Sequence, residues 1–190
     1  MVHHILKQAG EQSVIAGNIG ESVAKKIKTA AAYFVLELSS FQLDDIINFA
    51  PKIGVITNIT QDHLDRYDND FSKYLKSKLR INQNQTQRDF LLFNADDPEL
   101  NKAIKQINTQ ATIYGFGYNS FDTNTTYLED DQIVIKTKKE KIMINTLDFT
   151  LKGRHNLLNA MAASTVANLL EVSKKTIRES LLNFKGAPHR

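Results

Sequence analysis

The sequence contains no cysteine, which excludes a disulfide framework and any metal site built on thiolates. It also lacks an apolar run of about 18 residues, the length needed to cross a bilayer, and residues 1–7 lack the pattern of a signal peptide. Lysine and arginine are dispersed despite a formal net charge of +3, so the basic cluster at residues 136–141 is typical of a solvated hairpin. We therefore expect a cytoplasmic protein that binds neither nucleic acid nor a membrane.

The composition is that of an ordinary globular domain: 190 residues, of which 42% are hydrophobic and 24% charged. Short apolar runs alternate with helical periodicity, which is typical of βαβ units. The pattern predicts strands at residues 14–16, 33–38, 53–59, 90–93 and 111–116, and helices at residues 1–7, 21–31, 41–49, 71–83 and 98–107. These elements predict an α/β fold with a mainly parallel, doubly wound sheet flanked by helices.

The pattern changes in the last third of the chain. Short alternating runs at residues 126–128, 132–136 and 141–145 predict a small antiparallel β meander. Helical periodicity then returns at residues 155–170 and 173–184, and Ser173 has the side chain of an N-cap for the second of these helices. We therefore expect a C-terminal helical pair after the meander.

Two strands are followed by polar residues that favour a ligand site. Glu37 lies at the end of the second predicted strand, and ligands of open α/β sheets bind beyond the carboxyl ends of strands. The loop at residues 58–67 follows the next strand and carries carboxylates, an arginine and His63, which can hold a hard cation or position an anionic substrate. We expect both loops to open onto one crevice.

Three further segments each allow two interpretations. Residues 17–20 read Gly-Asn-Ile-Gly and could present amides to an anion, but a tight turn is the simpler explanation. The lysines at residues 76–78 have the spacing of a solvated helix face. Asn156 and Asn159 share one helix face, and since a cap explains only one of them, the other favours a ligand. No Gly-x-x-x-x-Gly-Lys-Ser/Thr loop occurs, so a triphosphate site is not complete in this sequence.

Seven motifs occur in order along the chain: Gly-Asn-Ile-Gly at 17–20, Glu-Leu-Ser-Ser-Phe-Gln-Leu at 37–43, Asp-His-Leu-Asp-Arg-Tyr at 62–67, Lys-Leu-Arg-Ile at 78–81, Asn-Ala-Asp-Asp at 94–97, His-Asn-x-x-Asn-Ala at 155–160 and Gly-Ala-Pro-His-Arg at 186–190. Together they resemble the central domain of the Mur ligases of peptidoglycan synthesis, and among them the members that add D-glutamate to UDP-N-acetylmuramoyl-L-alanine. The resemblance extends from residue 17 to residue 190.

This resemblance implies ATP-dependent amide formation with Mg²⁺, in which a substrate carboxylate becomes an acyl phosphate and the amine of D-glutamate attacks it. Glu37 matches the ligand of the Mg²⁺ between the β- and γ-phosphates. His63 matches the ligand of a second ion close to the muramoyl substrate. Lys78 matches the family's carbamylated lysine, so the resemblance makes His63 and Lys78 catalytic and contradicts the surface interpretation of Lys78.

Five more positions match binding residues of the family. Asn18 and Ser39 match positions near the muramoyl nucleotide. Asn156 and Asn159 match the adenine-nucleotide side, and Arg190 matches an arginine that contacts the phosphate or ribose of ATP.

Residues 1–190 thus correspond to a central ATPase domain without the phosphate loop, the N-terminal uridine-nucleotide domain or the C-terminal amino-acid domain. We expect such a chain to be inactive alone. Two alternatives stay open: a related ligase that adds another amino acid, as the diaminopimelate and folylpolyglutamate enzymes do, and a non-catalytic remnant that binds a nucleotide or a partner.

Overall fold

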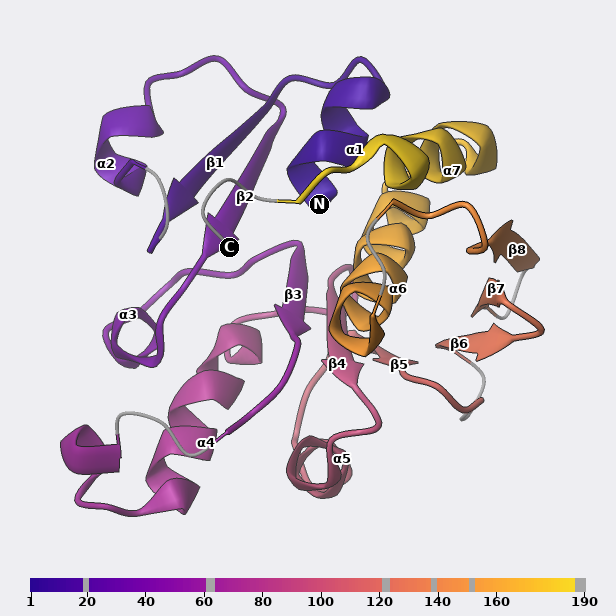
Figure 1. The fold of residues 1–190 in the computed structure, drawn as a ribbon. Helices are drawn as coiled ribbons and strands as arrows, with labels where there is room; N and C mark the ends of the chain where they lie inside the picture. The colour runs from indigo at the N-terminus through magenta and orange to yellow at the C-terminus, as the bar shows by residue number, and fades with distance from the viewer. Residues whose placement is uncertain (19–20, 61–63, 121–123, 138–139, 151–152, 187–190) are drawn as a thin grey trace. The chain divides into compact units, whose positions relative to one another are not determined.

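The computed structural model describes residues 1–18, 21–60, 64–120, 124–137, 140–150 and 153–186 (Figure 1). Contacts within the chain define two units: the first joins Met1–Glu37 to Phe116–Arg190, and the second is Leu38–Gly115. The first unit contains α1 Val2–Gln8, β1 Ser13–Gly17, α2 Val23–Lys26, β2 Tyr33–Glu37, β6 Thr125–Glu129, β7 Gln132–Lys136, β8 Lys141–Asn145, α6 Arg154–Leu169 and α7 Lys174–Asn183. The second contains α3 Ser40–Asp44, β3 Ile53–Ile56, the 3-10 turn η1 Leu64–Tyr67, α4 Phe71–Leu79, the 3-10 turn η2 Arg80–Asn82, β4 Phe90–Asn94 and α5 Pro98–Ile104, and β5 Thr112–Phe116 starts in it.

Both kinds of strand pairing predicted from the sequence are present. Strands β1 and β2 pair in parallel, as do β3 and β4. Strands β6, β7 and β8 form the expected antiparallel meander. β1 and β2 make a sheet of two strands, whereas β3 to β8 belong to a sheet of six. The mixed α/β class, the meander and the C-terminal helical pair are therefore confirmed.

A two-residue turn joins β6 to β7. Glu129 pairs with Gln132 across it, and the residues between them, Asp130 and Asp131, have φ angles of 45° and 55°. Positive φ at both central positions defines a type I′ turn, whose twist matches that of the flanking strands. Aspartate tolerates this conformation better than most side chains, so these two residues set the register of the hairpin.

Helices α1, α6 and α7 lie together in the first unit (Figure 1). Helix α1 buries Ile5 and Leu6, and α6 buries every residue from Ala160 to Ala167. Small alanine side chains allow other elements to approach α6 closely on all sides, and Thr165 of α6 bonds Thr126 of β6 at 2.7 Å. Within the described residues, no helix is long and apolar enough to cross a bilayer.

The core of the second unit packs α4 and α5 around β3 and β4. Its buried residues include Ile56, Tyr67, Tyr74, Leu91, Phe93, Leu100 and Ile104. Pro98 occupies the first turn of α5, as predicted, where its missing N–H has no helical partner to lose. Thus the apolar faces expected from the sequence form this core.

Two helices have about half the predicted length or less, whereas α4 and α5 end only three or four residues early. The helix expected at residues 21–31 is only Val23–Lys26, with no buried residue, and Ile27 beyond it is 67% exposed. The helix expected at residues 41–49 ends at Asp44. The predictions fail because most helical stability comes from burying an apolar face. After α3, moreover, side chains of η2 and the turn that follows it satisfy the backbone carbonyls that a longer helix would bond internally.

Candidate functional site

Two of the expected site residues meet at the carboxyl end of the β1-β2 pair. Glu37 ends β2 and pairs with Gly17, the last residue of β1. The next residue, Asn18, donates its backbone N–H to the Glu37 carbonyl oxygen at 2.7 Å. Glu37 and Asn18 are both exposed. The structure therefore brings together the backbones of two residues that come from separate sequence motifs.

Gly17 allows this close approach. Its φ is +111°, and a Cβ at this position would lie 2.3 Å from the Glu37 carbonyl oxygen. No side chain fits in that space. Residues 19–20 of the Gly-Asn-Ile-Gly segment lie outside the described residues. An anion-binding loop and a tight turn therefore both stay predictions from the sequence.

Ser39 and Gln42 form a capping box at the start of α3. The Ser39 hydroxyl accepts a bond from the Gln42 backbone N–H at 3.4 Å, and the Gln42 side-chain oxygen accepts one from the Ser39 backbone N–H at 2.9 Å. Such reciprocal bonds satisfy two backbone donors that the helix leaves unpaired. Ser39, predicted to bind substrate, therefore also has a structural role, and its hydroxyl lies at a helix N-terminus.

Helix α4 carries Lys78 in a different environment from its neighbouring lysine. Lys76 is exposed, as the solvated-face interpretation predicts, but Lys78 is partly buried. Its Nζ atom lies 5.6 Å from the centre of the Tyr74 ring, which is itself only 6% exposed. The prediction of a fully solvated lysine is wrong for Lys78, because the residue one turn earlier is a buried tyrosine rather than a polar side chain.

Asp70 begins α4 and carries a negative charge there. Its carboxylate accepts the Ser72 backbone N–H at 2.8 Å. Hydrogen bonds from the Ser72 side chain and backbone lower the pKa of the Asp70 carboxyl below its ordinary value. An ionised carboxylate at this end of a helix is favoured by the helix dipole, so Asp70 helps to start the helix that carries Lys78.

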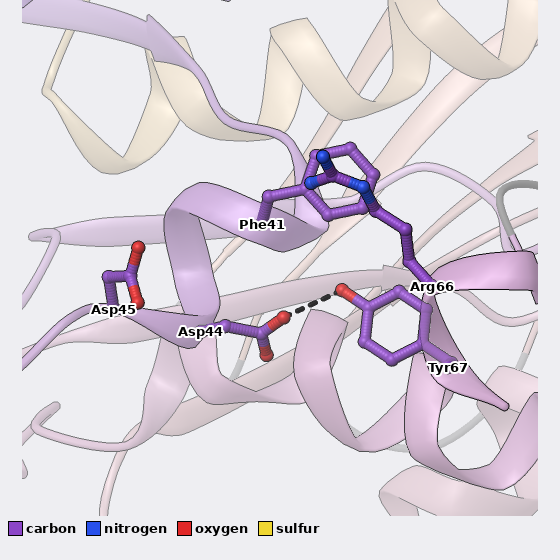
Figure 2. Close-up of a pocket in the computed structure, with 5 residues that line it drawn as sticks. All are labelled: Phe41, Asp44, Asp45, Arg66 and Tyr67. Atoms are coloured by element: carbon purple, nitrogen blue, oxygen red, sulfur yellow. Dashed lines mark hydrogen bonds between the residues drawn. The ribbon is translucent and has the colours of Figure 1, made fainter.

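A pocket of about 370 Å³ lies between α3 and η1 in the second unit (Figure 2). Its walls are formed by Phe41, Asp44 and Asp45 from α3 and the residue after it, and by Arg66 and Tyr67 of η1. The Arg66 guanidinium lies 4.2 Å from the centre of the Phe41 ring, and the Tyr67 hydroxyl donates to Asp44 at 2.7 Å. The sequence predicted no role for Arg66 or Tyr67, although both belong to the Asp-His-Leu-Asp-Arg-Tyr motif at residues 62–67.

The loop after β3 is attached to the start of α5. Asp97 caps α5 by accepting the backbone N–H groups of Glu99 and Leu100, each at 3.1 Å. Its other carboxylate oxygen accepts the Ile59 backbone N–H at 2.9 Å. Asp97 therefore ties the segment that leads to His63 to a helix N-terminus. His63 itself lies outside the described residues, so the predicted crevice shared by His63 and Glu37 stays a prediction.

Replacement of Asp97 by alanine should lower the free energy of unfolding by about 2 kcal/mol, because it removes a cap and leaves the Ile59 N–H without its acceptor. Asp70→Ala is the matched control, since Asp70 caps a helix of the same unit and its carboxylate accepts the Ser72 N–H at the start of that helix. It should cost about 1 kcal/mol. Urea denaturation of the two variants measures the difference, and equal losses would argue against the tie to Ile59.

The start of α6 does not use either of the predicted asparagines as a cap. Gly153 is the N-cap residue, with no side-chain cap bond, and Asn156 and Asn159 lie within the first two turns. Asn159 is exposed and Asn156 partly buried. The capping explanation is therefore wrong for both asparagines, and their role in binding a ligand stays a prediction. Arg190 lies outside the described residues.

A second pocket, of about 600 Å³, borders this end of α6 in the first unit. Tyr118, Gly153, Arg154 and Leu157 are among its lining residues. The Arg154 guanidinium lies 4.6 Å from the centre of the Tyr118 ring, and the Tyr118 hydroxyl donates to the Arg154 carbonyl oxygen at 3.1 Å. The lining thus offers an aromatic ring and a cation, groups that suit a nucleotide, and it includes neither Asn156 nor Asn159.

The fit of a divalent cation can be judged from the donors present. No cluster of three or more His, Asp or Glu that could hold a metal occurs among the described residues. Mg²⁺, however, uses few protein ligands: one or two carboxylates, completed by substrate phosphates and water. An exposed Glu37 at a strand end fits such a site, whereas an all-protein metal cage does not fit the described residues.

Sequence similarity to known proteins extends over most of the chain. Residues 1–167 match the family described as the Mur ligase middle domain. This chain belongs to that family. The Mur ligase middle domain described above is 43% identical to the UDP-N-acetylmuramoylalanine–D-glutamate ligase of Christiangramia forsetii and 40% identical to that of Bacteroides fragilis. Each alignment covers 100% of the chain but only 43% of the relative.

Solved structures support the same fold at lower sequence identity. The UDP-N-acetylmuramate:L-alanyl-γ-D-glutamyl-meso-diaminopimelate ligase (MPL) from Neisseria meningitides matches the Mur ligase middle domain with a TM-score of 0.71 at 17% identity, over 98% of this chain and 61% of that one. MurF ligase from Thermotoga maritima, solved in complex with ADP, matches with a TM-score of 0.68 at 16% identity, over 98% of this chain and 45% of that one. At these identities the match concerns the fold.

Proposed function

We propose that this Mur ligase middle domain is part of an ATP-dependent ligase that adds D-glutamate to UDP-N-acetylmuramoyl-L-alanine in peptidoglycan synthesis. The observation that carries the proposal is the 43% identity over the whole chain to the Christiangramia forsetii D-glutamate ligase. Use of an adenine nucleotide is supported by the ADP complex of the MurF relative. The reaction belongs to the cytoplasm, where its nucleotide substrates are made.

The proposed reaction has two steps. The terminal carboxylate of UDP-N-acetylmuramoyl-L-alanine attacks the γ-phosphorus of ATP, so that an acyl phosphate forms and ADP leaves. The amine of D-glutamate then attacks the acyl carbon, an amide bond forms and inorganic phosphate leaves. Both steps depend mainly on positioning the reactants and neutralising phosphate charge.

Glu37, His63 and Lys78 have the proposed roles closest to the reacting groups. Glu37 would hold a Mg²⁺ ion, which when bound would supply charge neutralisation for phosphoryl transfer. His63 binds a second ion beside the muramoyl substrate. Lys78 would act as a carbamate, formed when its neutral amine adds to CO₂ and releases a proton, so that a cation is replaced by an anion able to join the metal site. The partly buried position of Lys78 next to Tyr74 suits a lysine that does not serve as a solvated surface charge.

The remaining predicted residues bind the two nucleotides. Asn18 and Ser39 contact the UDP-sugar substrate, and this proposal is supported by the exposure of Asn18 beside Glu37 and by the position of Ser39 at the start of α3. Asn156 and Asn159 contact the adenine nucleotide, together with Arg190. The uridine-binding and D-glutamate-binding domains of the ligase are the partners of this domain.

A hybrid ligase tests the proposal. The chain replaces the matching 43% of the Christiangramia forsetii relative, and release of ADP is measured with and without UDP-N-acetylmuramoyl-L-alanine and D-glutamate. We expect ADP release that requires both substrates, and no turnover by the 190-residue chain alone, whose sequence lacks a phosphate loop.

One outcome would contradict the proposal, and another would contradict only the expected inactivity of the isolated chain. A hybrid that is folded by circular dichroism but releases no ADP would favour a remnant that binds nucleotide without catalysis. Turnover of the isolated chain that depends on D-glutamate would show that the parts of the relative outside the matched 43% are not needed. A Glu37→Gln hybrid serves as the inactive control.

A further inference from the structure

A chain of buried hydrogen bonds joins the start of α3 to the residue next to Lys78. The Ser77 hydroxyl, 3% exposed, donates to the Ser40 carbonyl oxygen at 2.9 Å. The Tyr67 hydroxyl lies 3.1 Å from the Ser77 oxygen and 2.7 Å from Asp44 Oδ2, and it can donate its one proton to either. All four residues belong to the second unit, and Figure 2 shows Tyr67 aimed at Asp44.

The same face of α4 holds α3 at a second point. Arg80, three residues after Ser77 and therefore on the same side of the helix, donates from Nε to the Leu43 carbonyl oxygen at 2.8 Å and from a terminal nitrogen to the Ile46 carbonyl oxygen at 2.9 Å. Ser77 thus binds the first turn of α3 and Arg80 binds its end. With contacts at both ends, α3 cannot slide or rotate against α4 without breaking a bond.

These contacts lie next to two proposed site residues. Ser39 directly precedes Ser40, whose carbonyl accepts the Ser77 bond, and Lys78 directly follows Ser77. Successive residues of a helix differ by about 100° in direction, so Ser77 faces α3 while Lys78 points elsewhere on α4. The bond from Ser77 to Ser40 therefore joins the backbone residue before Lys78 to the one after Ser39.

We propose that Ser77 and Tyr67 are positioning residues, which set the placement of Lys78 relative to Ser39 during ligation. This inference rests on the proposed function, because it concerns the same site. The ordinary explanation is that the buried hydroxyls only stabilise the packing of two helices. A variant that loses turnover in excess of its loss of stability separates the two explanations, since a displacement of about 1 Å at a reactive group costs up to about 10²-fold in rate.

The test uses the hybrid ligase with Ser77→Ala, and with Tyr67→Phe as a second variant that removes one hydroxyl and keeps the ring. We expect kcat to fall about tenfold in each, with KM for ATP unchanged because Asn156 and Asn159 lie on another helix. The double variant should lose little more than either single one, because the two hydroxyls act through one chain of bonds. Ser77→Thr keeps the hydroxyl and should recover part of kcat.

Asn84→Ala is the matched control. Asn84 donates to the Ile47 and Phe49 carbonyl oxygens at 2.7 and 3.0 Å, so it fastens the segment after α3 without a link to Ser40 or Lys78. We expect it to lower stability in urea as much as Ser77→Ala but to keep kcat. Unchanged kcat in the folded Ser77→Ala and Tyr67→Phe hybrids, or an equal loss in Asn84→Ala, would overturn the inference. An inactive parent hybrid would instead contradict the proposed function.

Discussion

Replacing Lys78 by alanine should reduce the rate of ADP release by the hybrid ligase about 10²-fold or more, the usual cost of removing one group that stabilises charge at the reacting centre. The expected loss follows from the proposed carbamate of Lys78, an anion that alanine cannot supply. The position of Lys78 supports this expectation, since it is partly buried and its Nζ atom lies near the Tyr74 ring. The measurement is kcat at saturating ATP, UDP-N-acetylmuramoyl-L-alanine and D-glutamate.

Lys76→Ala provides the control on the same helix. Lys76 is exposed, and removing a solvated lysine should leave kcat within about twofold and the free energy of unfolding within about 0.5 kcal/mol. If both variants keep full activity, Lys78 is a structural residue and the proposed metal-site role is wrong. Mass spectrometry of the untreated and the bicarbonate-treated hybrid then tests the carbamate itself. Because the carbamate is acid-labile, its added mass should disappear after acid treatment.

Replacing Gly17 by alanine should lower the free energy of unfolding by about 3 kcal/mol, the sum of a left-handed backbone strain and an overpacking cost. The new Cβ would lie 2.3 Å from the Glu37 carbonyl oxygen, and φ at Gly17 is +111°. Strands β1 and β2 must separate to relieve the overlap. Urea denaturation of the 190-residue chain measures the loss.

Gly10→Ala isolates the backbone part of this effect. Gly10 also has a positive φ, of +82°, but a Cβ there would meet nothing within 4 Å. We expect a cost of about 1 kcal/mol for strain alone. Equal losses at Gly10 and Gly17 would show that the ends of β1 and β2 tolerate a side chain, and the close pairing of Glu37 with Asn18 would then not require glycine.

Local signals predicted those elements whose ends are decided by their own residues. Ser173 caps α7 and accepts the Thr176 backbone N–H at 3.1 Å, and Pro98 opens α5, both as expected from the sequence. Strands β7 and β8 match their predicted bounds because turn residues interrupt the alternating apolar pattern. The lengths predicted for the helices at residues 21–31 and 41–49 were wrong, because those lengths depend on which surfaces and side-chain donors the rest of the fold presents.

The motif at residues 37–43 illustrates how one set of residues serves two purposes. The sequence predicts a ligand motif here, whereas in the structure these residues also stabilise α3 and its packing. Ser39 and Gln42 cap α3, the Ser40 carbonyl oxygen accepts a hydrogen bond from the Ser77 hydroxyl, and Leu43 is buried. A serine at a helix start is a good cap whether or not a ligand follows. Stability variants alone therefore cannot identify a binding residue in this motif.

The amino-acid sequence by itself determined the α/β class, the order of strands and helices, and the family resemblance, because these follow from periodicity, caps and motif spacing along the chain. Only the tertiary structure decided that Asn18 lies against Glu37, that Asp97 holds Ile59, and that Ser77 links α3 to α4. Those contacts join residues that are distant in sequence. A buried hydroxyl or carboxylate bonds the backbone group that the packing of the fold places beside it, and its own neighbours in the chain do not determine which group that is.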